Sequence, residues 1–348
     1  MAYLTIIAGC GYLGTYLARE LLAQQLPVVA LTRQLSSAAE LTAAGIPALA
    51  CDLTDGASTL ALRELSPPRI GRDLLGPSLA LAPLAGQAVR IVHCAASGRG
   101  GRGELYRAIY LEGCRHLRAA FPGAHRFFFT SSTSVYSQIE GEWVDETSPA
   151  QPERETGRVL RQTEDETLAA GGLVGRLAGL YGPGRSLLLQ NFLGGRAVID
   201  VRTQEPPTPD GRWVNQIHVR DAARAILHLL ALPDATRHRI WNIADSTPLQ
   251  QRPLYARLAQ KFDLPIPPNA APDLDRKRGW THKRVDNRRL RNSGWHPLYP
   301  DWFSALHHDP AFLPSLLLPT TLSELNPPYE PPAQPAPDQA QLFRPRLD

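Results

Sequence analysis

Lysine is almost missing from this sequence. No lysine precedes Lys261, and Lys261, Lys277 and Lys283 are the only three in 348 residues. Arginine therefore carries nearly all of the positive charge, and the formal net charge is only +4. The basic residues are scattered along the chain and form no stripe, so a nucleic-acid partner is not expected.

Cysteines and long apolar runs are also scarce. The four cysteines show no C-x-x-C spacing, which argues against a metal site or a disulfide and favours buried free thiols. The apolar run at the start of the chain is too short for a membrane span, and it lacks the charged segment that begins a signal peptide. We therefore expect a cytoplasmic protein with no membrane partner.

Short apolar runs alternate with helical patterns through the chain. Continuous apolar runs without polar alternation indicate strands that are covered by helices on both faces. The pattern predicts an α/β protein of the Rossmann type with a doubly wound parallel sheet, and the length leaves room for a smaller C-terminal lobe. Strands are expected at 3–9, 27–32, 47–53, 89–96, 126–136, 173–184 and 239–245, and helices at 14–25, 104–121, 218–232 and 253–262.

The chain divides into three parts by composition. Residues 1–170 are expected to form the first domain, to which 214–240 returns, and 171–311 mainly the smaller lobe. Residues 312–348 are rich in proline and poor in apolar clusters, which predicts a flexible tail. The stretch 62–88, with several prolines and glycines, is expected to be irregular.

The first expected strand leads into a glycine-rich turn. The string "GCGYLG" comprises Gly9, Cys10, Gly11, Tyr12, Leu13 and Gly14. A G-x-G-x-x-G string between a strand and a helix is typical of dinucleotide binding, because the glycines allow a tight turn, close approach of a pyrophosphate and close packing of the helix. The N-terminus of the helix then offers N–H groups to the phosphates.

The end of the second strand bears on the choice of cofactor. Thr32 and Arg33 stand where NAD-preferring proteins carry an acidic residue, and an arginine pairs with a 2′-phosphate. NADP(H) is therefore favoured over NAD(H), although Arg33 is also consistent with a solvated loop charge. Four further positions follow the third and fourth strands and are expected to contact the cofactor: Asp52, Leu53, Ala95 and Ala96.

Five later strings, taken with the glycine turn, resemble the extended, epimerase/dehydratase-like branch of the short-chain dehydrogenase/reductases. They are "FTSSTSVY", "DETSPAQP", "RLAGLYGPGR", "NQIHVRDAARAI" and "WNIADSTPL", in the order and at the spacing of that family. The resemblance covers residues 3 to about 305. It implies a Rossmann domain that binds NAD(P) and a smaller lobe that closes over a small-molecule substrate, often a nucleotide sugar. A homodimer is common in the family.

The resemblance also implies four catalytic residues: a serine, an asparagine, a tyrosine and a lysine. The serine is present as Ser132, but the asparagine position holds Tyr110. The tyrosine and lysine positions fall on "TGRVLRQTE" (156–164) and hold Thr156 and Leu160. In the family the lysine lowers the pKa of the tyrosine, so this chain lacks the usual proton-transfer pair.

Other residues are candidates for the missing roles. Tyr110 and Tyr136 are expected near the cleft with Ser132, and either tyrosine could serve as a non-standard acid. The three lysines lie far along the chain, so none is expected to replace the missing one. The resemblance is closest to atypical members of the superfamily, which keep the glycine turn and lose the tyrosine and lysine.

Two functions therefore stay open. The first is an NADP(H)-dependent oxidoreductase or epimerase, acting on a sugar-like or nucleotide-sugar-like substrate at a non-standard site. The alternative is a non-catalytic NADP(H)-binding redox sensor or regulatory protein. A scaffold that uses the proline-rich tail to bind a partner is a weaker third interpretation.

Overall fold

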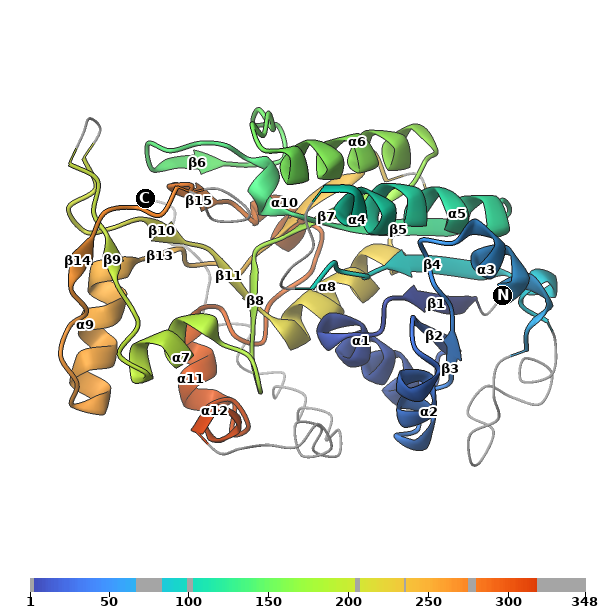
Figure 1. The fold of residues 1–348 in the computed structure, drawn as a ribbon, viewed down its shortest axis with the longest axis horizontal. Helices are drawn as coiled ribbons and strands as arrows, with labels where there is room; N and C mark the ends of the chain where they lie inside the picture. Colours follow the sequence, from blue (N-terminus) through green and yellow to red (C-terminus); the bar gives the residue numbers. More distant parts are fainter. Residues whose placement is uncertain are drawn as a thin grey trace, which may run out of the picture.

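A seven-stranded parallel sheet forms the centre of the molecule (Figure 1), in the computed structural model, which describes residues 3–66, 83–98, 103–203, 207–234, 236–274 and 280–317. The strand order is β3-β2-β1-β4-β5-β7-β12. The order reverses between β1 and β4, which is where open α/β sheets bind ligands. The strands are β1 (Leu4–Ala8), β2 (Val28–Thr32), β3 (Ala48–Ala50), β4 (Val89–His93), β5 (Arg126–Ser132), β7 (Leu173–Leu177) and β12 (Ile240–Ile243).

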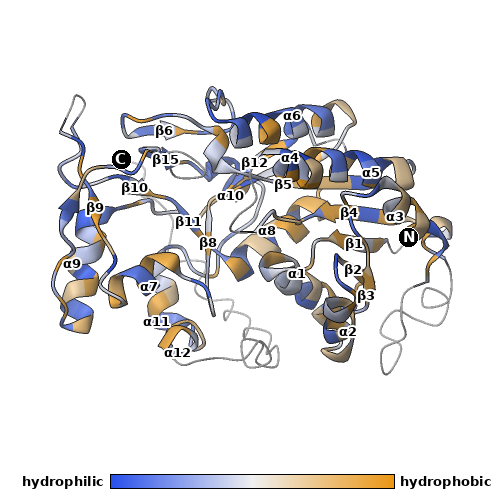
Figure 2. Cartoon of the chain, in the orientation of Figure 1, coloured by the Kyte–Doolittle hydropathy of each residue, from blue (hydrophilic) through white to orange (hydrophobic). Residues whose placement is uncertain are grey.

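Helices cover both faces of this sheet, which confirms the predicted doubly wound architecture (Figure 1). The strands are mainly hydrophobic (Figure 2), and β1 is buried along its whole length. One face carries α1 (Tyr12–Ala23), α2 (Leu35–Ala43) and α8 (Val219–Ala231). The other carries α3 (Gly56–Ala61), α4 (Gly103–Arg107), α5 (Gly113–Ala120) and α6 (Glu155–Ala169). No helix in the described part of the chain has both the length and the apolar character that a bilayer span requires.

A second, smaller lobe has its own hydrophobic core, which includes Trp302 and Phe312. Its helices are α7 (Leu187–Leu193), α9 (Gln251–Phe262), α11 (Trp302–His308) and α12 (Pro314–Leu317). Four two-stranded sheets accompany them: β8 (Gly179–Tyr181) with β11 (Gln216–His218), β9 (Ile199–Asp200) with β14 (Asn269–Ala270), β10 (Trp213–Val214) with β13 (Leu249–Gln250), and β6 (Glu142–Val144) with β15 (Lys283–Val285). The short helix α10 (Arg288–Asn292) packs near β12.

The structure moves three boundaries expected from the sequence. Strands β7 and β12 belong to the main sheet, so the nucleotide-binding domain extends past residue 170 and past residue 240. The tail does not begin at 312, because Phe312 is fully buried and the Ser315 hydroxyl accepts a hydrogen bond from Gly184 N at 2.7 Å. The rest of the predicted tail, 318–348, lies outside the described residues, as does 67–82 of the expected irregular stretch.

The long helix expected at 104–121 is interrupted. A π-helical turn, Ala108–Glu112, separates α4 from α5. His93 at the end of β4 lies with its Nε2 at 3.0 Å from the Ile109 carbonyl oxygen in this turn. Burial lowers the pKa of His93 to about 4, so the ring is neutral at neutral pH and can donate this hydrogen bond. The His93 ring thereby supplies a partner for a carbonyl of the π-helical turn.

Candidate cofactor and substrate site

The predicted site residues lie at one edge of the main sheet. Because β1 to β5 and β7 are parallel, their carboxyl ends meet at the same edge. The glycine turn follows β1, Thr32 ends β2, and Ser132 ends β5. The cofactor positions and the one retained catalytic position therefore share a single edge, as the sequence order predicts.

The three glycines of the turn have three different surroundings. Gly9 has a φ of +95°, and a Cβ there would lie 2.3 Å from Ala95 Cα. At Gly14 a Cβ would lie 2.6 Å from the Gly9 carbonyl oxygen. At Gly11, in contrast, a Cβ would meet no atom within 4 Å. Gly9 and Gly14 are thus required by packing, and Gly11 borders open space that suits a closely approaching pyrophosphate.

Helix α1 begins at this open space without a side-chain cap. Gly11 is its N-cap residue and no acidic side chain lies in the first turn, so the first N–H groups of the helix have no partner within it. These groups fit the phosphates of a dinucleotide. The side chains beside them point elsewhere: Leu13 is buried in the core, and the Tyr12 hydroxyl donates to the Pro183 carbonyl oxygen at 3.1 Å.

Two residues of the turn already use their backbone N–H groups in hydrogen bonds within the protein. Gly9 N and Cys10 N both donate to the Leu31 carbonyl oxygen at 3.0 Å. The Cys10 thiol lies 3.8 Å from the Thr15 hydroxyl, and burial raises the pKa of this thiol to about 11. Cys10 is therefore a neutral residue that shapes the turn.

The side chains at the ends of β2 and β3 frame the expected position of the adenosine. Hydrogen bonds from Thr54 N and Oγ1, at 2.9 and 2.8 Å, are the main reason why the pKa of Asp52 is lowered. The charge of Arg33, which is exposed, lowers it further. Leu53 is buried, and its carbonyl accepts from His116 Nδ1 at 2.9 Å. An exposed cation next to the turn fits a phosphate on the ribose.

Ser132 and Tyr136 bound the short turn that follows β5. The Ser132 hydroxyl accepts a hydrogen bond from Ser134 N at 3.2 Å and so caps the 3₁₀ turn Thr133–Val135. Tyr136 is fully buried, and its hydroxyl accepts from Arg176 Nη1 at 2.9 Å and lies 2.9 Å from Asn242 Oδ1. These contacts favour a structural role for Tyr136, and the catalytic role considered from the sequence stays a prediction.

Tyr110 lies on the π-helical turn and belongs to the main core. Its ring is 4.3 Å from the ring of Tyr106 and 6.4 Å from the ring of Phe129, measured between centroids, and only 5% of the residue is exposed. The wider turn changes which residues of this helix share a face, so the register expected for an uninterrupted helix does not apply. A contact between Tyr110 and substrate stays a prediction.

Helix α6 holds the positions of the missing tyrosine and lysine. Thr156 lies in its first turn, and Leu160 is 1% exposed and packed in the hydrophobic core. A Cβ at Gly157 would lie 2.4 Å from Pro152 Cβ, so this glycine is required where the helix begins. Glu164 is fully buried and pairs with Arg176 at 2.7 Å. The helix keeps these packing residues, and a threonine and a leucine stand where the resemblance implies a tyrosine and a lysine.

Lys283 lies on β15 of the smaller lobe, in keeping with the second-lobe position expected from the sequence. Its Nζ nevertheless reaches the Tyr136 carbonyl oxygen at 2.8 Å, at the end of the turn that Ser132 begins. Strand β15 carries Lys283 there by pairing with β6, which follows that turn in the chain. The sequence offers only an indirect hint of this position, which is that lysines are rare in this chain.

The pH dependence of stability is expected to report this buried lysine. Burial lowers the pKa of Lys283 from 10.5 to about 7. Between these two values the unfolded chain binds a proton that the native protein does not, so the free energy of unfolding is expected to rise as pH rises through this window. Lys283→Gln lacks this component. Denaturant unfolding of both proteins across the window measures it, and parallel pH profiles would contradict the assignment.

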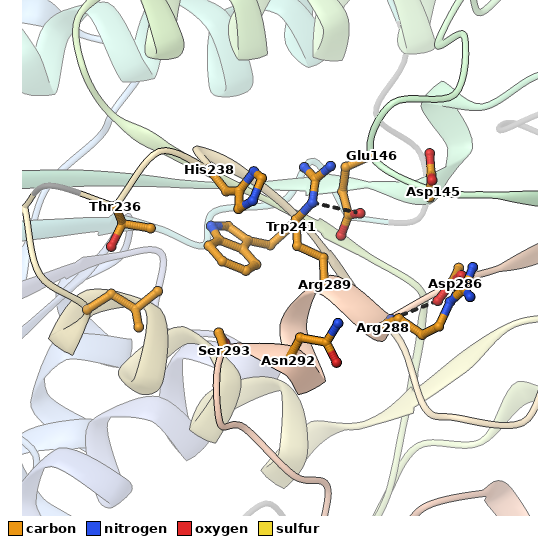
Figure 3. Close-up of a pocket in the computed structure, with 11 residues that line it drawn as sticks. Asp145, Glu146, Thr236, His238, Trp241, Asp286, Arg288, Arg289, Asn292 and Ser293 are labelled. Carbon is orange, nitrogen blue, oxygen red and sulfur yellow. Dashed lines mark hydrogen bonds and ion pairs between the residues drawn. The ribbon is translucent and has the colours of Figure 1, made fainter. Parts of the chain in front are cut away.

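A separate cavity of about 560 Å³ lies beside β12 (Figure 3). Four of its charged side chains form two ion pairs: Glu146 with Arg289 at 3.3 Å, and Asp286 with Arg288 at 2.5 Å. A fifth, Asp145, accepts hydrogen bonds from Thr147 N and Ser148 N through its Oδ1. The cavity shares no residue with the predicted site.

Known proteins share this sequence pattern and this fold. Residues 5–244 match the model of the NAD dependent epimerase/dehydratase family. Protein YeeZ of Escherichia coli (strain K12) is 35% identical over 181 residues, 51% of this chain and 59% of YeeZ. UDP-glucose 4-epimerase of Corynebacterium glutamicum is 26% identical over 209 residues, 50% of this chain and 63% of that protein. The matched region spans less than two thirds of either relative.

Solved structures align over a larger share of the chain. A protein of Methylobacillus flagellatus, named for NAD-dependent epimerases/dehydratases, has a TM-score of 0.65 at 28% identity, covering 91% of this chain and 99% of its own. UDP-glucose 4-epimerase of Thermus thermophilus, solved in complex with NAD, has a TM-score of 0.66 at 18% identity, covering 90% and 98%. The second likeness is one of fold alone.

Proposed function

Because the chain belongs to the NAD dependent epimerase/dehydratase family, we propose that it binds NADP(H) at the glycine turn and acts as an oxidoreductase or epimerase on a sugar-like or nucleotide-sugar-like substrate. The observation that carries the proposal is the contrast among the three glycines, of which only Gly11 borders open space at an uncapped helix start. The Corynebacterium glutamicum relative, which is named for UDP-glucose 4-epimerase activity, supports the substrate class.

The chain's own residues would share the work as follows. The first N–H groups of α1 hold the pyrophosphate, and Arg33 pairs with the 2′-phosphate. Ser132 donates a hydrogen bond to the reacting oxygen of the substrate. When bound, the nicotinamide would supply or accept the hydride, and water would supply or accept the accompanying proton at the oxygen that Ser132 contacts. Alignment of the two reactants removes much of the entropic barrier, which makes the reaction feasible without the usual tyrosine.

Arg33→Ala is expected to weaken binding of NADPH about 10- to 100-fold and to leave binding of NADH nearly unchanged. The lost interaction is a hydrogen bond between charged groups, and only NADPH carries the phosphate that forms it. Titration of the protein's effect on nicotinamide fluorescence measures both affinities. Arg158→Ala is a matched control, because Arg158 is also exposed but lies on α6. An equal loss for both nucleotides would contradict the assignment.

A non-catalytic NADP(H) sensor is the second candidate. It is favoured by the packing of Leu160 in the core and by the occupied hydroxyl of Tyr136, since neither position can move a proton at the cleft. The two functions predict different results for purified protein given NADPH, NADP⁺ and a panel of carbonyl compounds and nucleotide sugars. Oxidation of NADPH or epimerisation seen by NMR supports the enzyme. Binding that discriminates NADPH from NADP⁺ with no turnover supports the sensor, and no binding of either nucleotide refutes both.

A further inference from the structure

The backbone of Lys283 is held by its neighbours on both sides. On one side β15 pairs with β6 in parallel, and Lys283 stands opposite Glu142. On the other, Asn215 Nδ2 donates to the Lys283 carbonyl oxygen at 2.9 Å, and Asn215 Oδ1 accepts from Val285 N at 2.8 Å. These contacts set where the side chain starts, so its Nζ has a defined position inside the protein.

The ammonium group of Lys283 has more donors than acceptors. A lysine side chain carries three N–H donors when charged and two when neutral, and within the described ranges the Tyr136 carbonyl oxygen is the one acceptor that Nζ contacts. The residue is only 3% exposed, so bulk water does not cover the remaining donors. Buried polar groups of proteins are normally hydrogen-bonded, and an exception calls for an explanation.

Two charged residues near the Lys283 ammonium have opposite effects on its pKa. Glu142 on β6 favours the charged form, and Arg212, which precedes β10, disfavours it. Arg212 is itself paired with Asp200 at 2.9 Å. His282 precedes Lys283 in the chain, and Arg284 follows it on β15, where the Arg284 Nε donates to the Gly141 carbonyl oxygen at 2.8 Å. Glu142 therefore attracts Lys283 without a contact that uses its free donors.

The position of Nζ links it to the candidate site. Ser132 caps the start of the turn Thr133–Val135, and Tyr136, which accepts from Lys283, ends it. The cation thus lies at the far end of the same short turn that presents Ser132. Helix α6, which would carry a lysine in the family pattern, has the buried Leu160 instead.

We propose that Lys283 is a substrate-binding residue of this site, which holds the Tyr136 carbonyl with one N–H and directs its other donors to an oxygen of the substrate. The substrate oxygen is a hydroxyl, carbonyl or phosphate oxygen of a nucleotide-sugar-like molecule. This inference rests on the proposed function. The C-terminal strand β15 thereby supplies the cation that α6 lacks.

NMR of the full chain carrying [13Cε]lysine tests the proposal directly, because three lysines produce three signals. The Lys283 signal is assigned with Lys283→Gln, and its titration midpoint is followed with and without saturating UDP-glucose. A bound oxygen stabilises the charged form, so the midpoint is expected to move to higher pH by about one unit. The signal of Lys261, exposed on α9, is the internal control.

Variants separate charge from hydrogen bonding. Lys283→Met is expected to bind UDP-glucose about tenfold or more weakly by calorimetry, Lys283→Gln to recover part of that loss, and Lys261→Gln to match the wild type. An unmoved midpoint with UDP-glucose bound, or no binding of UDP-glucose by the wild type, overturns the inference. NADPH affinity is measured on the same samples: if NADPH binds normally, only the role of Lys283 fails, and if it does not bind, the proposed function fails.

Discussion

Glu164→Gln is expected to lower the free energy of unfolding by about 3–5 kcal/mol, the cost of breaking a buried ion pair by removing one partner. Glu164 is fully buried, and its carboxylate pairs with Arg176 at 2.7 Å and accepts from the Ser131 hydroxyl at 2.5 Å. Arg176 also donates to Tyr136, so it joins α6, β7 and the turn after β5. Without Glu164 the guanidinium stays buried with no carboxylate partner.

The neighbouring position offers a matched control. Asp165 also pairs with an arginine, Arg161, but its side chain is 61% exposed. Asp165→Asn is therefore expected to change stability by about 0–1 kcal/mol, as surface pairs do. Denaturant unfolding measures both variants. The double variant Glu164→Gln/Arg176→Met is expected to regain part of the loss, and equal effects of the two single variants would contradict a buried pair.

Gly11→Val is expected to weaken NADPH binding about 100-fold or more while leaving the protein folded. The added side chain enters space that meets no protein atom within 4 Å, and the φ of −88° at Gly11 is accessible to any residue. A valine there would keep the pyrophosphate from the helix N–H groups, and the loss of two charge-assisted hydrogen bonds accounts for a change of this size. Calorimetric titration with NADPH measures it.

Two other glycines make this result specific. Gly123→Val also enters open space but lies far from the turn in sequence, after α5, and is expected to change neither affinity nor folding. Gly9→Val is expected to impair folding itself, because its Cβ would overlap Ala95 and because the φ of +95° disfavours side chains. Wild-type affinity in Gly11→Val would remove the main support for the cofactor site.

The sequence was sufficient for the sheet and for the glycine turn. Both follow from short-range patterns, in which apolar runs mark buried strands and glycine spacing marks a strand-to-helix turn. The absence of the tyrosine and lysine was also readable, because Gly157 and Glu164 preserve the frame of the helix that should carry them. Packing against Pro152 and pairing with Arg176 explain why these two residues remain.

Only the tertiary structure decided the roles of the remaining candidates. Tyr136 belongs to the core because Arg176 and Asn242, which are distant in sequence, occupy its hydroxyl. Phe312 is buried because a second core forms around it. Lys283 reaches the turn after Ser132 through a three-residue strand pairing across 141 positions of sequence, from Glu142 to Lys283. The hydrophobic periodicity of a segment indicates which of its own residues are buried. It does not indicate which distant segments come together, and these contacts depend on that.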